Sequence, residues 1–596
     1  MFPMSSIFRS PSPRFVLILG LNLVISLAHG QTAVNQEQLQ RERERALRQQ
    51  QEQRPDVNLG TPAASAMAQD FPEQEQPCRR ITAIALEGEQ AERFRFALDS
   101  VTGERGAVGR CLGSQGVNLV LARVESAIVA RGYTTTRVLA RPQDLSTGRL
   151  VLSVVPGRVR HIRFAPDADA RGTAFNALPI SPGDILNLRD IEQGLENFKR
   201  LPTVQADIKI TPSEDKGAEA GDSDLVIQYQ QAFPFRLTAS LDDGGAKATG
   251  KYLAGLTLSY DNWWTLNDLF YVSVSRSLNH YGDHGSHAYT LHYSLPLGNW
   301  MAAVTMSGNR YHQTVAGAFE NFVYSGRSET TEFKLSRLLH RDAAGKTTAF
   351  GKALLRKAYN AIDELEVGAQ QRRTTAWEAG LNHRQFLGDA IADATLAYRR
   401  SLDTQGAEPS SPFDLPQIGT RYGLWLLDAS VNAPFQLAGA RLRYSSTLRA
   451  QWNRGSLPPQ DQFSIGGRYT VRGFDGELTL QAERGWFLRN ELALGLGESG
   501  QEVFAGIDTG AVAGPSAQFL TGQRLTGAAL GLRGNLGKLS YDMFLATPLA
   551  KPQGFQTAAV TGGFNLQWAF CAELPAGKIP HHPRPRADCR ATAIAQ

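Results

Sequence analysis

From residue 235 onward, apolar and polar side chains alternate one by one along the chain. In the segment KYLAGLTLSY, Leu258 alternates with Thr257 and Ser259. The segments FYVSVSRS and HAYTLHYSL repeat the pattern, with serine, threonine and histidine opposite valine, leucine and tyrosine. A period of two predicts a β-strand with one apolar and one polar face. About sixteen such segments of roughly ten residues lie between residues 235 and 570.

The connections between these segments alternate in length. The short ones lie at residues 296–299, 341–346, 386–389, 434–439 and 536–538, and several of the others are long, at roughly 313–328, 358–372, 403–418, 454–483 and 511–523. Short turns on one side and long loops on the other are typical of bacterial outer-membrane barrels, whereas a soluble β-sandwich would not readily produce this asymmetry. We therefore predict a transmembrane β-barrel of about 16 antiparallel strands over residues 232–570. An even number of strands would return both ends of the barrel to the periplasmic side.

Two small modules precede this predicted barrel. Residues 78–158 contain, in order, a predicted strand, two helices and two strands, with Gly132 as the C-cap of the second helix. Residues 159–231 repeat this order, with the helical segment LRDIEQGLENFKRL and the strands ADIKITPS and DLVIQYQ, although the first helix of this copy is short. We therefore predict two tandem α/β modules, each ordered strand–helix–helix–strand–strand.

The first 30 residues indicate a secretory signal peptide. Arg9 and Arg14 precede the apolar run FVLILGLNLVISL, and the small-residue segment AHG follows it. As a helix this run would span only ~20 Å, which is too short for a hydrocarbon core of ~30 Å and argues against an uncleaved anchor.

Export would place the chain in an oxidising compartment, which fits its four cysteines. Cys78 and Cys111 flank one compact segment, while Cys571 and Cys589 lie in the C-terminal tail, residues 571–596. The sequence alone leaves several connectivities open. Proximity favours disulfides 78–111 and 571–589. Metal binding by these cysteines is not indicated, because no two of them form a C-x-x-C pair.

Residues 31–54 include the segment NQEQLQRERERALRQQQEQR, which is rich in strong helix formers. Polar and charged side chains cover every face of this predicted helix, so it has no apolar stripe to bury. One hypothesis is a solvated or disordered charged arm. The other is a plug helix, ~30 Å long, that occupies a polar cavity as deep as a bilayer. Residues 55–77, with four prolines among small polar residues, indicate a linker.

Composition and motifs narrow the function classes. A formal net charge of +5, without a long basic cluster, does not favour a nucleic-acid partner. The patterns GLGESG (495–500) and GAKATGK (245–251) resemble phosphate-binding loops, but each leads into a predicted strand instead of a helix N-terminus, so we expect no nucleotide and no cofactor. Because no hydrolase motif or pair of carboxylates stands out, we also expect no enzymatic activity. A hairpin near residue 285 is more consistent with a solvated loop than with a metal site, despite its histidines His280, His284, His287 and His292.

The stretch GGRYTVRGFDG places an arginine among glycines and aromatic residues in the long connection 454–483. If this loop turns into the barrel lumen, Arg472 needs an acidic partner on the wall. In the strand VFAGIDTGA, the alternation puts Ile507 on the lipid side and Phe504, Gly506 and Asp508 inside. Because an aspartate facing lipid is destabilising, we predict that Asp508 is lumenal and meets Arg472. Gly506 would leave room beside it for the loop.

The tetrad VRGF, formed by Val471, Arg472, Gly473 and Phe474, together with FAGID on the thirteenth predicted strand, resembles the superfamily of outer-membrane insertases and secretion transporters. Within it, the chain is most similar to the two-partner secretion transporters, the haemolysin and haemagglutinin secretion and activation proteins. This resemblance implies a pore-plugging helix, a linker, two POTRA domains and a sixteen-stranded barrel, and it implies that Arg472 and Asp508 form the family's loop–wall ion pair. One departure is that such barrels commonly end on an aromatic residue, whereas residues 571–596 follow Phe570 here.

The resemblance also implies a function in the Gram-negative outer membrane, with the POTRA domains in the periplasm. These domains would capture an unfolded partner exoprotein of the haemagglutinin, haemolysin or contact-dependent toxin class, which would thread outward once the plug helix leaves. The other expected partners are outer-membrane lipid and the barrel assembly machinery that inserts the chain. One alternative is an assembly or insertion factor for other outer-membrane proteins, which needs no plug helix. A passive porin or ligand receptor is disfavoured by the tandem modules.

Overall fold

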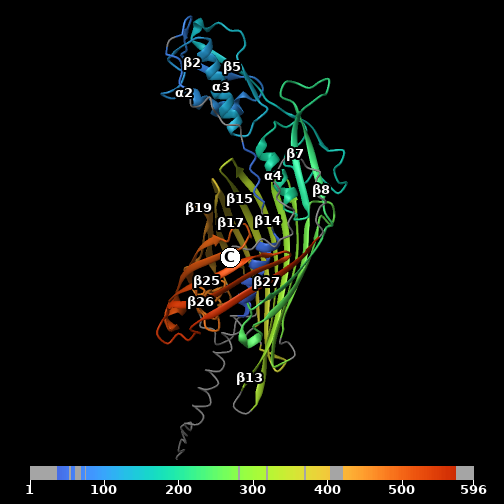
Figure 1. Cartoon of the computed structure of the whole chain (residues 1–596), viewed down its shortest axis with the longest axis vertical. Helices are drawn as coiled ribbons and strands as arrows, with labels where there is room; N and C mark the ends of the chain where they lie inside the picture. The colour runs from blue at the N-terminus through green and yellow to red at the C-terminus, as the bar shows by residue number, and fades with distance from the viewer. Residues whose placement is uncertain are drawn as a thin grey trace, which may run out of the picture.

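The computed structural model describes residues 36–52, 55–60, 69–73, 75–278, 282–316, 320–367, 371–402 and 421–571. A barrel forms the larger part of the molecule, and two small modules lie beyond one of its rims (Figure 1). The expected signal peptide and Cys589 lie outside the described residues, and the side chain of Cys571 is not described either. The pairing of these two cysteines therefore stays a prediction.

Sixteen long strands of the described chain close into one antiparallel barrel. Successive strands pair from β9 to β27, and β27 pairs back with β9, where Phe570 lies opposite Leu237. A two-residue strand, β16 (Leu365–Glu366), only extends the hairpin of β15. The predicted fold class is confirmed. The long strands are β9 (Phe235–Asp242), β10 (Leu253–Asp261), β11 (Leu269–Ser277), β12 (His284–Leu297), β13 (Trp300–Ala316), β14 (Asn321–Arg341), β15 (Gly345–Ile362), β17 (Arg372–Leu387), β18 (Ala390–Leu402), β19 (Gly423–Leu437), β20 (Ala440–Asn453), β23 (Arg484–Gly495), β24 (Glu502–Ala513), β25 (Arg524–Leu536), β26 (Leu539–Ala550) and β27 (Thr561–Cys571).

Polar and apolar side chains alternate along each strand because one face of the barrel wall lines the lumen and the other faces lipid. On β10, Thr257 is 6% exposed and faces the lumen, whereas Leu258 is 42% exposed on the outer surface. On β24, Asp508 is 1% exposed and Ile507 is 57% exposed. An outer surface of leucine, isoleucine and aromatic residues is stable only against lipid, while the polar inner side chains find hydrogen-bond partners in the lumen.

Two of the connections expected to be long are shorter in the structure. β13 and β14 remain paired as far as Ala316 and Asn321, so most of the loop predicted at 313–328 is strand. β15 likewise runs to Ile362, which shortens the connection predicted at 358–372. Polar side chains do not end these strands because the cross-strand backbone hydrogen bonds can continue beyond the lipid layer, into water. The loop predicted at 403–418 lies outside the described residues.

The first module packs its helical segments against a three-stranded sheet of order β2–β5–β4. Its core brings Val120, Val124 and Ile128 of the main helix against Leu150 and Leu152 of the central strand. A disulfide joins Cys78 to Cys111, with Cα atoms 5.4 Å apart. The elements are β1 (Arg79–Arg80), β2 (Ala83–Glu87), η2 (Ala91–Leu98), α2 (Asp99–Thr102), β3 (Cys111–Leu112), α3 (Ser114–Ala130), β4 (Arg137–Leu139), η3 (Leu145–Thr147) and β5 (Arg149–Val155).

The start of α3 is capped by the segment that precedes the first module. The carboxylate of Glu75 accepts hydrogen bonds from the backbone N–H groups of Gln115, at 2.8 Å, and Gly116, at 3.0 Å. These N–H groups have no partner within the helix, and the helix dipole favours a negative charge beside them. Phe71 is buried nearby, 4.4 Å from the guanidinium of Arg123. Residues 71–73 and 75–77 are therefore anchored to this module.

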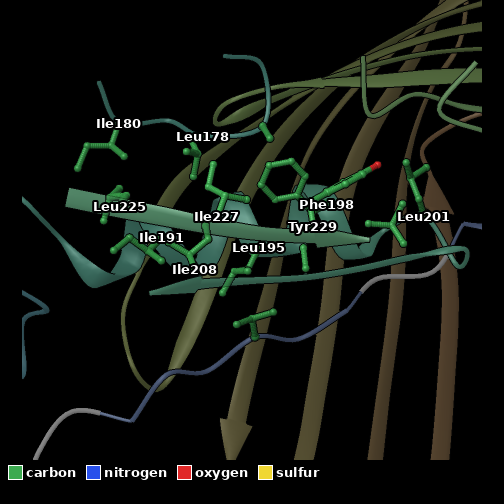
Figure 2. Close-up of a cluster of buried hydrophobic side chains, with 14 of the residues drawn as sticks. Leu178, Ile180, Ile191, Leu195, Phe198, Leu201, Ile208, Leu225, Ile227 and Tyr229 are labelled. Carbon is green, nitrogen blue, oxygen red and sulfur yellow. The ribbon is translucent and has the colours of Figure 1, made fainter. Parts of the chain in front are cut away.

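The second module has one helix among its described residues, not the two that the repeat predicted. Between β6 (Val159–Phe164) and α4 (Leu188–Lys199) the chain forms turns that contain three prolines. Proline lacks an N–H donor and clashes with the preceding helical turn, so this segment does not become helical. It instead inserts Leu178 and Ile180 into the core beside Ile227, as Figure 2 shows. The remaining strands are β7 (Val204–Pro212) and β8 (Ser223–Gln231), in the sheet order β6–β8–β7.

The second module is docked on the turns at the adjacent barrel rim. The side-chain amide of Asn197 on α4 donates to the carbonyl oxygen of Gly298, at 2.8 Å, in the turn between β12 and β13. Arg200 donates to the carbonyl oxygen of Asn267, at 2.9 Å, in the turn between β10 and β11. Because these polar groups are buried, losing either partner would leave an unsatisfied group, and the contacts fix the module on this rim.

The N-terminal helix, residues 36–51, lies inside the barrel, where Figure 1 shows it in blue between the strands. In the part of the chain that the structure describes, no helix is long and apolar enough to cross a bilayer.

Candidate functional site in the barrel lumen

The connection 454–483 folds back into the barrel. Its base consists of η6 (Pro459–Asp461) and a small sheet of β21 (Phe463–Ile465) and β22 (Leu480–Ala482). Beyond this base, Val471 is 0% exposed and Phe474 is 3% exposed, in a cluster with Phe487 and Leu525 of the barrel wall. Two apolar side chains thus hold the loop against the wall on either side of Arg472.

Two glycines allow the loop and the wall to approach closely. Gly473 has φ +102°, a backbone conformation that favours glycine. A Cβ at this position would lie 2.5 Å from the carbonyl oxygen of Thr547 on β26. On β25, a Cβ at Gly527 would lie 1.8 Å from the carbonyl oxygen of Arg472. The glycine of the VRGF motif is therefore required both for its conformation and for the contact with the wall.

Arg472 binds Asp508 through two parallel hydrogen bonds. Its Nε donates to Oδ2 at 2.6 Å and its Nη2 donates to Oδ1 at 2.8 Å. The backbone N–H of Arg472 adds a third hydrogen bond to Oδ2, at 3.1 Å. Bidentate pairing of a guanidinium with a carboxylate fixes both distance and orientation. The structure thus places the two residues that the sequence predicted to meet in direct contact, with Asp508 on the lumenal face of β24.

A second acidic residue, Glu491 on β23, shares the guanidinium of Arg472. Its Oε1 accepts a hydrogen bond from Nη1 of Arg472, and its Oε2 accepts one from Nη1 of Arg533, at 3.0 Å. Nε of Arg533 also donates to Glu502 at 3.0 Å. Sequence reasoning missed Glu491 and Arg533. The parity of the strand RGWFLRNELALG would have placed Glu491 inside, opposite the outward Leu492.

The other predicted wall residues lie beside this network. A Cβ on Gly506 would come within 2.7 Å of Nη2 of Arg472, so a larger residue would displace the guanidinium. The ring of Phe504 is 2% exposed and lies 5.8 Å from the guanidinium carbon of Arg472 and 4.6 Å from that of Arg533. These distances allow cation–π attraction between Phe504 and both arginines.

The N-terminal helix is held in the lumen by ion pairs on several sides. Arg48 pairs with Glu332 of β14 at 2.7 Å, and Glu42 pairs with Arg449 of β20 at 2.7 Å. Further hydrogen bonds join Gln50 to Gln567 of β27, at 2.6 Å, and Gln51 to Ser259 of β10, at 3.0 Å. The all-round polarity of the helix is therefore matched by a polar surface on each side, as the plug hypothesis requires.

Asp461 connects the helix to the loop that carries Arg472. Its carboxylate accepts a hydrogen bond from Arg356 of β15 at 3.2 Å and lies 3.9 Å from Arg41 of the helix. Arg41 also donates to the carbonyl oxygen of Gln460, and Gln38 donates to that of Gln462 at 3.3 Å. Withdrawing the helix would remove partners from the base of this loop.

The linker after the helix is fixed between α4 and the barrel. The backbone N–H groups of Val57 and Leu59 donate to Glu196, at 3.0 Å, and Glu192, at 2.8 Å. Arg341, at the end of β14, pairs with both glutamates at 3.0 Å. Burial favours the neutral form of Glu196, but Lys346 and Arg341 outweigh it and hold the pKa of Glu196 below its ordinary value. The Glu196 carboxylate is thus a charged acceptor for the linker.

The three described histidines of this hairpin, His284, His287 and His292, lie along β12 and do not gather around one point. His292 is 2% exposed on the inner face of β12, where its ring hydrogen-bonds to Thr305 at 2.9 Å and Ser294 at 3.0 Å. The interpretation as a solvated loop is therefore wrong for His292, which belongs to the lumen wall, while His280 lies outside the described residues. Over the described ranges, no three His, Cys, Asp or Glu side chains are grouped so that they could hold a metal ion.

Models of known protein families match the two modules and most of the barrel. The family model of the haemolysin secretion/activation proteins ShlB/FhaC/HecB matches residues 221–534. A POTRA-domain model of the ShlB type matches residues 80–157, and a second POTRA-domain model matches residues 158–212. The two modules and most of the barrel are thus covered in the order expected from the resemblance.

Individual relatives match along most of their length. The outer membrane transporter CdiB-2 of Burkholderia pseudomallei is 38% identical over 517 residues, which are 83% of this chain and 87% of the relative. The hemolysin transporter protein ShlB of Serratia marcescens is 25% identical and covers 73% of this chain and 74% of its own length. Among solved structures, CdiB from Acinetobacter baumannii superposes with a TM-score of 0.79 at 28% identity, covering 90% of this chain and 99% of that structure.

Proposed function

Because the chain belongs to the haemolysin secretion/activation family ShlB/FhaC/HecB, we propose that it binds an unfolded partner exoprotein in the periplasm and secretes it through its own barrel. The protein is an outer-membrane transporter whose POTRA domains lie in the periplasm. The family indicates secretion and not catalysis. The exported partner is a large protein of the haemagglutinin, haemolysin or contact-dependent toxin class.

The observation that carries this function is the occupied lumen. Residues 36–51 fill the channel with a helix that contacts the wall through ion pairs such as Arg48–Glu332 and Glu42–Arg449. Such pairs in a polar lumen are exchangeable, because a leaving helix can be replaced by water or by another polar chain. A helix with side chains is ~10–12 Å wide, so its departure would open a path wide enough for an extended polypeptide. The helix in the lumen supports a transporter that is closed at rest.

Capture of the partner uses the POTRA domains. In their described sheets, β4 and β7 are edge strands and offer backbone groups to an incoming strand. Addition of a strand to a sheet edge recognises an unfolded chain through its backbone and tolerates many sequences. This mode suits a partner that arrives unfolded and must be passed on.

Capture is coupled to opening through the linker. Val57 and Leu59 are bound to Glu196 and Glu192 on α4 of the second POTRA domain. A movement of α4 against the barrel therefore pulls on the linker, which follows the helix in the chain. The helix in turn contacts the base of the VRGF loop through Asp461. We propose that the helix leaves, the partner threads past the loop, and folding outside the cell gives the export its direction.

The function is tested by co-expressing the chain with a large exported protein encoded beside its gene. The exoprotein should reach the cell surface or the medium only when the transporter is present. The levels of other outer-membrane proteins should stay constant when the transporter is deleted. A general fall in those levels, with the exoprotein still secreted, would instead assign the chain to membrane-protein assembly.

A further inference from the structure

The second POTRA domain carries one aromatic side chain that the fold leaves in the open. In the described part of the two POTRA domains, the exposed large apolar side chains are Val108, Leu139 and Phe175, and Phe175 is the only aromatic one, with 75% of its surface exposed. The neighbouring Ala177 and Leu178 are buried in the domain core. A single exposed apolar side chain is common on a protein surface, so the surroundings of Phe175 decide what it contacts.

Hydrogen bonds on both sides of Phe175 fix it at the rim of the barrel. The carbonyl oxygen of Thr173 accepts a hydrogen bond from Asn267 Nδ2 at 2.8 Å. On the other side, Asn176 Nδ2 donates to the carbonyl oxygens of Leu266, at 2.5 Å, and Pro296, at 3.1 Å. Asn176 is 2% exposed, so these bonds are shielded from water. The height of Phe175 relative to the barrel is therefore set by the turn between β10 and β11.

That same turn carries the most exposed tryptophan pair of the described barrel. Trp263 is 47% exposed and Trp264 is 65% exposed. The ring of Trp263 lies 4.8 Å from Tyr260 and 5.4 Å from Phe270, on the outer face of β10 and β11. Aromatic residues at the end of outer-membrane strands form a girdle at the level of the lipid headgroups, because their rings are amphipathic. The turn thus marks where the periplasmic leaflet begins.

We propose that Phe175 inserts into the headgroup region of the periplasmic leaflet, beside this aromatic girdle, and that lipid completes the docking of the second POTRA domain. The occupant is lipid because hydrogen bonds of Thr173 and Asn176, the neighbours of Phe175, join it to the turn that carries Trp263 and Trp264. The contact adds a membrane anchor to the domain whose helix α4 binds the linker. This anchor would keep α4 in place over the barrel mouth until the partner arrives.

The test uses the full chain with Cys571→Ser and Cys589→Ser, reconstituted in liposomes of phosphatidylethanolamine and phosphatidylglycerol without exoprotein. A nitroxide is attached at Phe175→Cys, and in a second variant at Phe235→Cys on the lipid face of β9. The matched control carries the nitroxide at Leu139→Cys on the first POTRA domain, because the Leu139 side chain is 51% exposed. Collision rates with oxygen and with a water-soluble nickel chelate report the depth of each label. The label at position 175 should favour oxygen, as the label at position 235 does.

A label at position 175 that collides with nickel as freely as the label at position 139 would overturn the lipid contact. The lipid contact would also be overturned if the label is water-accessible at first and becomes shielded only when the exoprotein is added. The surface would then bind the exported chain. Because no exoprotein is present in the first measurement, the result does not depend on whether the chain transports it.

Discussion

The guanidinium of Arg472 and the carboxylate of Asp508 face each other through hydrogen bonds of 2.6 and 2.8 Å, with side chains 2% and 1% exposed. This geometry fixes the depth of the VRGF loop, because the backbone N–H of Arg472 also donates to Asp508. Glu491 takes the remaining side of the guanidinium. Between the apolar contacts of Val471 and Phe474, the charged side chain of Arg472 thus attaches the loop to the wall.

Replacing Arg472 with alanine should abolish or sharply reduce secretion of the partner while the barrel still inserts. The change removes the guanidinium that both Asp508 and Glu491 bind, and it leaves Asp508 with Arg489, at 3.9 Å, as its ion-pair partner. Breaking a fully buried pair costs ~3–5 kcal/mol. The strand pairing that closes the barrel is untouched, so the loss should be confined to the loop. Secreted exoprotein is compared at matched transporter levels in the outer membrane. Normal secretion by the variant would show that Arg472 has no part in transport.

Exchanging the two charges should not restore transport. In Arg472→Asp with Asp508→Arg, the new aspartate would face Glu491, which is built to accept from a guanidinium. Like charges in a buried site are destabilising. Adding Glu491→Gln removes that repulsion, so the triple variant should secrete more than the double variant in the same assay. Equal secretion by the two would mean that Glu491 does not contribute to the position of the loop.

Removing the N-terminal helix should open the channel. Deletion of residues 31–54 is expected to raise ion conductance in planar bilayers while the barrel remains assembled, because the helix occupies the lumen. Arg48→Ala should have a smaller effect in the same direction, since it removes only the pair with Glu332. Arg45→Ala is the matched control, because Arg45 has an exposed side chain that pairs with Glu42 within the helix. Unchanged conductance after the deletion would contradict the plug role.

The barrel and the loop–wall contact were predictable from the sequence for one physical reason. Strand parity decides which side chains face lipid, and it assigned Asp508 and Phe504 to the lumen without any knowledge of pairing. Parity cannot choose between partners, however. The contact between Arg472 and Glu491 joins a loop to a strand through a three-dimensional arrangement, and no local pattern specifies it.

Two sequence predictions, one loop and one helix, differ from the structure, and each difference has a physical cause. The connection predicted at 313–328 is mostly strand, because cross-strand hydrogen bonding continues wherever both partners can be solvated. The missing helix of the second POTRA domain was expected from the repeat alone. There, docking on the barrel through Asn176 and burial of Leu178 decide the conformation. Tertiary contacts thus override the repeat in the segment that touches another domain.

Breaking the disulfide of the first POTRA domain should lower its stability. Cys78 and Cys111 are separated by 33 residues, and a cross-link that closes such a loop contributes about 3–4 kcal/mol in the chain-entropy description. The variant Cys78→Ser with Cys111→Ser should therefore unfold this domain at a lower urea concentration, as followed by proteolysis of the full chain. Cys571→Ser with Cys589→Ser serves as the control, and an equal shift in both variants would contradict a specific role of the first pair.

Weakening the contacts of the linker should open the channel even when the helix is still part of the chain. Arg341 is the cation shared by Glu192 and Glu196, the two carboxylates that accept the backbone N–H groups of Val57 and Leu59. In Arg341→Ala these carboxylates repel each other and bind the linker less well, so the helix should leave the lumen more often and conductance events should become more frequent. Arg337→Ala, on the same strand but stacked over Trp300, should leave the conductance unchanged.

Acidification should weaken the hydrogen bond that the backbone N–H of Val57 donates to the carboxylate of Glu196. The pKa of Glu196 is lowered in the folded protein from its ordinary value of 4.5, so its stabilising effect is present above that pH and is lost as the pH falls through the lowered pKa. Conductance of the wild-type chain should therefore stay low at neutral pH and rise only on acidification below about 4.5, whereas Glu196→Gln should show frequent opening already at neutral pH. Opening of the wild type that begins well above that pH would assign the gate to a different titrating group.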